Sequence, residues 1–470
     1  MPKLEMLVPG ASPNGTREVV APWDGTVIAE IETGGAEAVE RALVTATSLG
    51  DPLPIHERVA ILERAGALMR ERRESLAVEA AREGGKPLVD SLVEVDRAID
   101  GVRLCAEAIR TQAGGGIPMG INPASSHRMA YTRWEPIGPV VAYSAFNHPL
   151  NLIVHQVGPA VAAGCPTIVK PAEATPMSCW SFVRILREAG LPPEWCQAIL
   201  TSDHGVAGQL SSDPRVAFFT FIGSGRVGWM LRSQLAPGTR CALEHGGAAP
   251  VVVLDDADLD DMIPLLAKGG FYHAGQVCVS VQRIFAARGI APTVAARLAE
   301  AAEALQVGDP TLPDTDVGPL IREAEVTRVS EWVSASGGAV RAGGAPVTTR
   351  AYAPTVLYDP SPDAKVSHEE IFGPVVCVYP VDGLDEAIRR SNDVPYSFQA
   401  SVFGKDLDAI LRATRRLHAA AVMVNDHTAF RVDWMPFAGH RESGLGIGGI
   451  GYTMRDMQQE KMVVIRSGEL

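Results

Sequence analysis

The chain lacks any long uninterrupted apolar run and any concentrated basic stretch, and both absences narrow its range of partners. No apolar run among the 470 residues approaches the roughly 18 residues that a membrane-spanning helix requires. The net charge is −13, and the densest basic stretch, RERRES at 70–75, is interrupted by acidic residues. Binding to a membrane or to nucleic acid is therefore not expected.

Cysteines are few and irregularly placed. There are seven, and no two are spaced as Cys-x-x-Cys, so the sequence predicts neither a disulfide framework nor a zinc site. The first 15 residues, MPKLEMLVPGASPNG, contain no apolar segment of the length found in secretion signals. We expect a cytoplasmic protein without a bound metal.

Helical periodicity of apolar residues marks the early part of the chain. It runs over 54–82 and again over 88–112, and the glycines and proline of GGKP at 84–87 separate the two segments. Two amphipathic helices are therefore expected to open the chain.

Short apolar strands alternating with helices follow, a pattern typical of a parallel, doubly wound sheet. The first series of expected strands is 139–145, 166–172, 216–222 and 249–255. The second series, beyond Cys278, is 282–287, 354–360, 374–381, 398–404 and 420–426. The two series predict two α/β domains, for which the chain is long enough. The final segment, 458–467, is expected to be a lone strand that pairs with the edge of a neighbour, so we expect a homo-oligomer.

Residues 223–228, GSGRVG, match the pattern Gly-x-Gly-x-x-Gly between an apolar strand and a helix. Glu244 follows about 20 residues later, where dinucleotide-binding proteins place the acid that binds a ribose. In that interpretation the glycines admit a pyrophosphate to the helix N-terminus. The pattern comes later in the chain than the first βα unit, where it usually occurs, so this assignment of Glu244 is doubtful.

Seven separated motifs occur in the order and approximate spacing typical of the aldehyde dehydrogenase superfamily. They are AFNHPLN (145–151), IVKPAEATP (168–176), GSGRVG (223–228), LEHGGAAP (243–250), GQVCVS (275–280), EEIFGPV (369–375) and MPFAGHRESGLG (435–446). They span nearly the whole chain, and seven in order are far more specific than any one of them. The sequence thus resembles this superfamily.

The resemblance implies an α/β fold. A Rossmann-type parallel sheet would bind the cofactor, a second α/β domain would carry catalysis, and a small β element would serve oligomerisation. The implied bounds are 1–113 and 134–243 for the NAD-binding domain, 244–445 for the catalytic domain, and 114–133 and 446–470 for the oligomerisation element. A homodimer or a homotetramer is implied.

The resemblance also assigns the cofactor contacts. The residues that match are Lys170, Glu173, Gly223, Ser224, Val227, Gly246, Glu370 and Phe372. Lys170 and Glu173 would bind the adenosine ribose, which frees Glu244 for chemistry. Because a carboxylate at position 173 repels a 2′-phosphate, NAD is expected and NADP is less favoured. Arg226, inside the glycine turn, is either a cation that softens this preference or a solvated side chain.

The implied catalytic residues are Cys278, Asn147 and Glu244. Oxidation of an aldehyde to an acid requires a nucleophile, and a thiolate adds to the carbonyl and later leaves when water cleaves the thioester. The Asn147 amide and the backbone N–H of Cys278 would hold the oxyanion, while Glu244 would act as general base. Because coenzyme-A-dependent relatives tend to lack this acid, water is the expected acceptor.

The implied substrate is a small, anionic aldehyde. Residues 425–439 and the LEHGGAAP motif look most like phosphonoacetaldehyde dehydrogenases, whereas lactaldehyde and small semialdehyde enzymes share a looser version. Phosphonoacetaldehyde is the first expectation, and lactaldehyde, glycolaldehyde and succinic semialdehyde are the alternatives. The expected substrate contacts are Arg97, His148, Arg431, His245 and Val277.

Each charged contact also has a purely structural interpretation. Arg97 could be a surface charge on its helix, His148 could only cap the following helix, and Arg431 could pair with Asp433 or another acid.

Two positions depart from frequent choices in the family. His245 stands where Leu is common, and it could tune Glu244, contact substrate or only pack. Val277 stands where relatives that act on phosphorylated substrates can have Arg, which weakens the anionic interpretation.

Two other classes of function stay open. One is a catalytically silent NAD-binding relative, against which the presence of Cys278, Asn147, Glu244 and Lys170 argues, since packing does not demand all four. The other is a thiol esterase that uses the same cysteine without a nucleotide.

Overall fold

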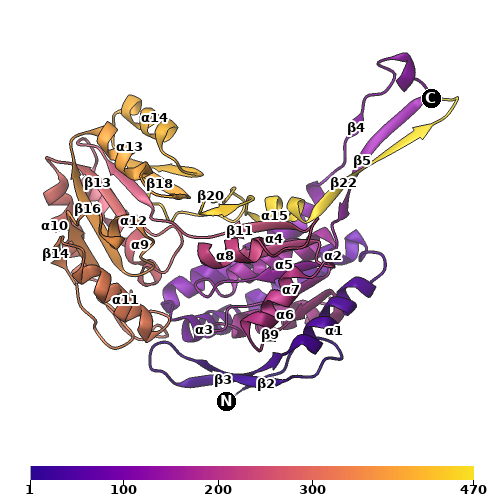
Figure 1. Cartoon of the computed structure of the whole chain (residues 1–470), viewed down its shortest axis with the longest axis horizontal. Helices are drawn as coiled ribbons and strands as arrows, with labels where there is room; N and C mark the ends of the chain where they lie inside the picture. Colours follow the sequence, from indigo (N-terminus) through magenta and orange to yellow (C-terminus); the bar gives the residue numbers. More distant parts are fainter. Residues whose placement is uncertain (1) are drawn as a thin grey trace.

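Two large sheets with separate hydrophobic cores form most of the molecule, and a smaller N-terminal sheet and a projecting arm complete it (Figure 1). The computed structural model describes residues 2–470. The α/β class predicted from the alternating strands and helices is confirmed.

The first large sheet has six strands in the order β21–β11–β10–β6–β7–β8, and all neighbours are parallel except the short edge strand β21. Its strands are β6 (Val140–Tyr143), β7 (Thr167–Lys170), β8 (Cys196–Ala198), β10 (Phe218–Ile222), β11 (Arg240–Glu244) and β21 (Gly444–Leu445). The helices that contact it are α1 (Ala36–Ser48), α5 (Asn151–Ala163), α6 (Met177–Glu188) and α8 (Gly225–Arg232). The helix α7 (His204–Ser212) follows the short strand β9 (Leu200–Thr201).

The expectation that two helices open the chain is wrong. Three strands come first, β1 (Lys3–Leu4), β2 (Gly15–Val20) and β3 (Val27–Gly34), and with β9 they form a sheet of their own. The Asp-Gly turn between β2 and β3 is a hairpin signal, with Gly25 at φ 75°.

The segment expected as one helix over 54–82 is two helices, α2 (Ile55–Glu71) and α3 (Arg73–Gly84). No glycine or proline causes the break; instead Arg72 pairs with Glu188 on α6 and Arg73 with Asp96 on α4 (Leu88–Thr111). Tertiary contacts on two sides therefore accompany the bend. Helices α2, α3 and α4 form a second layer outside α5 and α6.

The second large sheet has seven strands in the order β14–β15–β16–β13–β12–β18–β19, with only the β14–β15 pair antiparallel. Its strands are β12 (Pro250–Val253), β13 (Arg283–Ala287), β14 (Ala339–Ala342), β15 (Thr355–Tyr358), β16 (Val375–Val381), β18 (Gln399–Phe403) and β19 (Ala421–Val424). Its helices are α9 (Leu259–Phe271), α10 (Ala291–Glu303), α11 (Glu323–Ser334), α12 (Lys365–His368), α13 (Leu384–Asn392) and α14 (Leu407–Arg416). The strand expected at 249–255 therefore belongs to this sheet and not to the first series.

The arm corrects the expectation of a lone C-terminal strand. Strand β22 (Gln458–Arg466) pairs along its whole length with β5 (Arg128–Pro136), and β5 also pairs with β4 (Gly116–Ile117). The arm extends away from both large sheets (Figure 1). Helix α15 (Ile450–Asp456) leads into it and packs on α4 and α5.

Among residues 2–470, no helix combines the length and the apolar character needed to cross a membrane. The same residues contain no cluster of three or more His, Cys, Asp or Glu side chains that could hold a metal ion.

Candidate active site

A cavity of about 690 Å³ lies between the two large sheets and gathers most of the predicted site residues. Fourteen of the sixteen line its wall: Arg97, Asn147, His148, Gly223, Ser224, Val227, Glu244, His245, Gly246, Val277, Cys278, Glu370, Phe372 and Arg431. Lys170 and Glu173 do not line it, although Ala172 between them does. The fold thus assembles residues from distant motifs around one space.

Cys278 lies on a tightly turned segment that joins α9 to the second sheet. The three residues His273, Ala274 and Gly275 all have positive φ, at 48°, 53° and 67°. A Cβ on Gly275 would lie 2.1 Å from the carbonyl oxygen of Gly373, so the turn requires glycine there. This turn brings the Cys278 side chain, which is partly exposed, to the cavity.

Burial and the neighbouring carboxylate of Glu244 raise the pKa of the Cys278 thiol, while Arg431 opposes the shift. Burial likewise raises the pKa of Glu244, which Arg431 counteracts. A buried carboxyl group with a raised pKa is suited to accept a proton from a neutral thiol or a water molecule.

Asn147 is buried and its side chain is already oriented toward the cysteine loop. Its Nδ2 donates to the carbonyl oxygen of Gln276 at 2.9 Å, which leaves the second amide N–H of this group for another acceptor. An amide held in this way is a preorganised donor.

The glycine turn 223–228 forms the opposite end of the cavity. Ser224 is the N-cap residue of α8, and its side chain makes no capping hydrogen bond. His245 packs under this helix, where a Cβ on Gly228 would lie 2.0 Å from its Cε1. Its Nδ1 lies 2.8 Å from the carbonyl oxygen of Gly223, and its ring is near Phe221 and Trp229. These contacts favour the packing interpretation of His245.

Gly246 and Glu370 are in close contact beside this turn. A Cβ at position 246 would lie 1.6 Å from Glu370 Oε1, so a larger residue there would displace the Glu370 carboxylate. Among residues 2–470, this oxygen is buried without a hydrogen-bond partner, and burial raises the pKa of Glu370 to about 8. An unpartnered buried acceptor fits a ligand with hydroxyl donors, such as the ribose of a pyridine nucleotide.

The two predicted adenosine-ribose residues lie at and beyond the carboxyl end of β7. The Lys170 ammonium lies 5.5 Å from the centre of the Tyr143 ring, and burial lowers its pKa while Glu173 opposes the shift. Glu173 forms an ion pair with Arg17 of β2, and His204 Nδ1 lies 4.0 Å from its carboxylate. A cation from the N-terminal sheet therefore offsets the charge of Glu173, a contact that the motifs did not predict.

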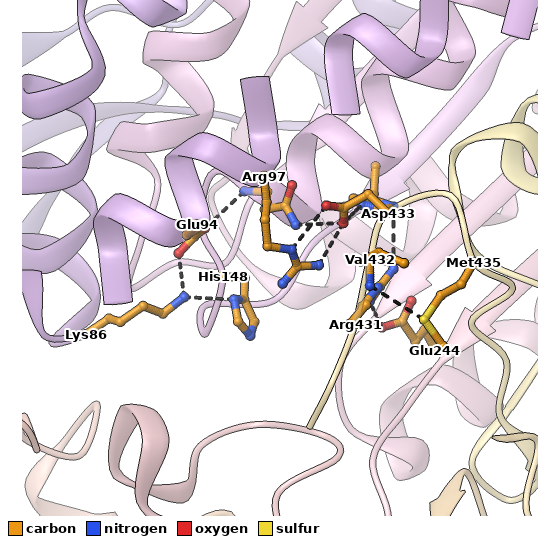
Figure 2. A network of polar contacts seen from close by, with 11 residues as sticks. Lys86, Glu94, Arg97, His148, Glu244, Arg431, Val432, Asp433 and Met435 are labelled. Carbon is orange, nitrogen blue, oxygen red and sulfur yellow. Dashed lines mark hydrogen bonds and ion pairs between the residues drawn. The ribbon is translucent and has the colours of Figure 1, made fainter. Parts of the chain in front are cut away.

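Arg97, on the cavity wall, is held by an ion pair with Asp433 (Figure 2). Its Nη2 and Nε donate to the two carboxylate oxygens of Asp433 at 2.7 and 3.1 Å, so Nη1 is left for a ligand. The side chain is 24% exposed, so Arg97 is not a simple surface charge. Asp433 also contacts His155 Nε2 at 2.7 Å; burial acts to raise its pKa, but the hydrogen bonds and charges of His155 and Arg97 outweigh this and lower the pKa below the ordinary range.

Arg431 does not pair with Asp433. Its Nη1 lies 3.8 Å from Glu244 Oε1, and its guanidinium lies 3.5 Å from the centre of the Phe437 ring. The acid that pairs with Arg431 is therefore Glu244, the predicted general base, and not Asp433.

His148 does not cap the following helix. Glu94 does so instead, because its Oε1 accepts from the backbone N–H groups of Leu150 and Asn151 at 2.9 and 3.0 Å. The His148 Nδ1 lies 2.8 Å from Nζ of Lys86, which in turn forms an ion pair with Glu94 (Figure 2).

Three residues that support this end of the cavity were not predicted as functional. Asp433 lay within a segment already associated with specificity, but Lys86 was interpreted only as part of a helix stop and Glu94 only as part of a helix. Only Glu94 carried a signal, because it is a fully buried charged residue at an apolar position of the helical pattern of α4. Lys86 and Asp433 lie outside helices and strands and carried no such signal.

Val277 is buried and packs with Val279, Phe398 and Phe437 in a small apolar cluster next to Cys278. The cavity wall beside the cysteine is therefore apolar at this position.

The two α/β sheets, with a cysteine and a nucleotide-binding type of glycine turn on the wall of one cavity, are typical of an enzyme that uses a cysteine nucleophile and a nucleotide cofactor. The family model described as "Aldehyde dehydrogenase family" matches residues 8–463. The chain belongs to the aldehyde dehydrogenase family and is an oxidoreductase that acts on aldehydes; the predicted superfamily is confirmed.

Individual relatives support the same family. A 3-sulfolactaldehyde dehydrogenase of Priestia megaterium is 37% identical over 453 residues, which cover 95% of this chain and 94% of the relative. Aldehyde dehydrogenase 21 from Physcomitrella patens, solved with the product succinate, is 32% identical with a TM-score of 0.94 and covers 100% of this chain and 99% of its own. Glyceraldehyde-3-phosphate dehydrogenase of Methanocaldococcus jannaschii, complexed with NADP, is 32% identical with a TM-score of 0.91, covering 97% and 100%. The similarity to a sulfolactaldehyde enzyme does not support the narrower resemblance to phosphonoacetaldehyde dehydrogenases.

Proposed function

We propose that this protein oxidises a small aldehyde with a phosphonate or sulfonate tail to the carboxylic acid, with NAD as the oxidant. The observation that supports the anionic tail is the position of Arg97, Arg431 and His148 on the wall of the cavity that also holds Cys278. Guanidinium groups bind such oxyanions through charge-assisted hydrogen bonds. Phosphonoacetaldehyde is the first candidate, and the relative named for 3-sulfolactaldehyde makes that aldehyde the second.

The apolar residue at 277 is compatible with this proposal because the cations come from other elements. Arg97 belongs to α4 and Arg431 to the segment after β19. Each guanidinium is already offset by a carboxylate, Asp433 or Glu244, so neither is an uncompensated buried charge before substrate binds.

In the proposed reaction, Glu244 accepts the thiol proton of Cys278, and the thiolate adds to the carbonyl carbon of the aldehyde. The Asn147 amide and the Cys278 backbone N–H hold the resulting oxyanion. A bound pyridine nucleotide supplies the two-electron oxidant that turns this adduct into a thioester. After Glu244 has released the thiol proton to solvent, it would remove a proton from the water that cleaves the thioester, which releases the acid and returns Cys278 to its starting form.

The cofactor would be held by the residues around the glycine turn. Ser224 and the N-terminus of α8 would face the pyrophosphate, and Glu370 with Phe372 would hold the nicotinamide half. Lys170 and Glu173 would bind the adenosine ribose, and the carboxylate of Glu173 favours NAD over NADP.

The arm supports a proposed assembly. β22 is an edge strand of the arm and carries the exposed apolar residues Met462, Val464 and Ile465. We infer a homodimer or homotetramer that pairs through this element. We retain the proposed domain bounds of 1–113 with 134–243, 244–445, and 114–133 with 446–470, and the cytoplasm as the compartment.

The proposal is tested by the variant Arg97→Ala. Wild-type protein is expected to oxidise phosphonoacetaldehyde and 3-sulfolactaldehyde with higher kcat/KM than lactaldehyde, succinic semialdehyde or propanal. In Arg97→Ala the KM for the phosphonate and sulfonate aldehydes should rise about 10- to 100-fold, since losing a hydrogen bond to a charged group costs roughly 1.5–3 kcal/mol. The KM for propanal should change little.

The matched control is Arg103→Ala. Arg103 lies on the same helix, is exposed, and within residues 2–470 forms ion pairs only with its helix neighbours Asp100 and Glu107. Its removal should leave both KM values unchanged. An equal rise for charged and neutral aldehydes in Arg97→Ala would refute the proposed anionic specificity.

A further inference from the structure

Lys86 lies just before α4 and is completely buried, with its ammonium between two groups of different chemistry (Figure 2). On one side it forms an ion pair with Glu94, and on the other its Nζ lies 2.8 Å from His148 Nδ1. Burial lowers the pKa of Lys86, whereas the charge of Glu94 and its hydrogen bond counteract that shift. Because its ammonium group is shielded from water, Lys86 acts through its contacts with Glu94 and His148.

The carboxylate of Glu94 keeps the lysine charged. Its other oxygen accepts from the N–H groups of Leu150 and Asn151 at the start of α5, where the partial positive charge of a helix N-terminus favours an anion. A buried carboxylate at this point in turn favours the ammonium form of its partner.

An ammonium group has three donors and no acceptor, so the Lys86–His148 hydrogen bond determines the histidine tautomer. Nδ1 of His148 has to accept, and the ring proton of the neutral imidazole is then on Nε2. Among residues 2–470, Nε2 has no hydrogen-bond partner, and the ring lines the cavity. The Nε2–H group is thus free to donate to a ligand there.

We propose that Lys86, held by Glu94, is a positioning residue that keeps His148 as the neutral Nε2–H tautomer and so gives the substrate cavity a donor that needs no proton uptake. What this donor binds rests on the proposed function: the anionic tail of the aldehyde. The tautomer itself does not depend on that function.

Burial and most of the groups around His148 oppose its protonation, and the neighbouring acid, Glu94, is itself paired with Lys86. Besides Lys86, the groups that face it are Glu94 and Arg97 of α4, Tyr272 and His273 of the turn 272–275, and Arg431. Burial, the larger cause, and the charges of Lys86, Arg97 and Arg431 hold the pKa of His148 well below its ordinary value. The imidazole therefore stays neutral from pH 6 to 9.

The direct test is ¹⁵N NMR of protein labelled at the imidazole nitrogens of its 11 histidines, with His148 assigned by comparison with His148→Gln. In wild-type protein, His148 should show an unprotonated Nδ1 and a protonated Nε2, with both shifts constant from pH 6 to 9. A protonated Nδ1, or a titration within this range, would overturn the proposal, and no variant of the lysine is needed for that result.

The double variant Lys86→Met/Glu94→Gln tests the cause. Because both charges are removed together, no unpaired carboxylate is left in the core, and the glutamine still accepts from Leu150 and Asn151. His148 should then populate both neutral tautomers, while burial still keeps the ring from taking up a proton. An unchanged Nε2–H tautomer in this variant would show that Lys86 does not set it.

Kinetics with a sulfonate aldehyde complete the test, because a sulfonate does not change charge between pH 6 and 9. The wild-type KM should be nearly independent of pH, whereas the KM of the double variant should be raised several-fold throughout this range, because only part of its His148 carries the Nε2–H donor. The kcat for propanal should be the same in the double variant as in the wild-type protein. If NMR shows the expected tautomers but the KM values of charged and neutral aldehydes change alike, the proposed substrate class fails while the role of Lys86 stands. If the KM values differ as expected but the tautomer does not depend on Lys86, only the role of Lys86 is rejected.

Discussion

The two ends of the cavity are built by different means. At the nucleotide end, close approaches of the main chain dominate: Gly246 leaves space only because it has no Cβ, and Gly228 does the same against His245. At the substrate end, paired side chains dominate, and the Arg97–Asp433 pair joins residues 336 positions apart.

This difference separates the part of the site that binds a constant ligand from the part that determines specificity for the aldehyde. A main-chain surface made by glycines accepts a constant ligand, and few substitutions are compatible with it. Buried ion pairs instead require each charge to be matched, so this end can change only by coordinated substitution of both partners. We therefore expect specificity for the aldehyde to reside in the paired charges.

The variant Cys278→Ala would sharpen the comparison most, because it removes the nucleophile between the two ends and leaves both ends intact. The rate of aldehyde oxidation should fall by roughly four or more orders of magnitude, as is usual for loss of a covalent nucleophile. Dissociation constants for NAD, measured by fluorescence, should stay within about twofold of the wild-type value. Retention of the wild-type rate would rule out the cysteine mechanism.

The pH dependence of cofactor binding tests the nucleotide end alone. Because the pKa of Glu370 is raised to about 8 by burial, this group is mostly protonated at pH 6 in the free protein. Ribose hydroxyls donate to a carboxylate, so binding favours the ionised form and releases a proton. The Kd for NAD should therefore fall by up to about tenfold per pH unit from pH 6 to 8 and level off above it.

Calorimetry in two buffers of different ionisation enthalpy would measure the released proton. The variant Glu370→Gln, which cannot ionise, should bind NAD with an affinity that no longer varies over this range. The same pH dependence in wild type and variant would exclude Glu370 as the titrating group.

The same contrast explains what the sequence could predict. The two series of parallel strands are short apolar runs, a local signal, and the sheets contain strands at all of the expected places. The N-terminal hairpin also had a local signal, the Asp24–Gly25 turn, which was overlooked. The break at Arg72 had none, because it accompanies ion pairs with two other helices.

Prediction of the site divides along the same line. The glycine turn, the cysteine loop and the LEHGGAAP motif are contiguous, and the cavity brings their residues together. The partners of Arg97, His148 and Glu173 lie far from them in the sequence, since Asp433, Lys86 and Arg17 meet them only in the folded chain. Single residues on a helix or strand carry no mark of such pairing.

The Arg17→Gln variant is expected to give the smallest effect, but one that is selective for NADP over NAD. Arg17 and Glu173 form an ion pair at the nucleotide end, of the kind that otherwise dominates the substrate end. This ion pair is partly exposed, at 35% for each side chain, so its free energy is about 0.2–1 kcal/mol. In Arg17→Gln the uncompensated carboxylate should repel a 2′-phosphate more strongly, so the Kd for NADP should rise about two- to fivefold while that for NAD barely changes. The double variant Arg17→Gln/Glu173→Gln should bind NADP more tightly than Arg17→Gln does. A comparable loss in the control Arg226→Gln, with no effect in Arg17→Gln, would instead assign the cation that moderates cofactor choice to the glycine turn.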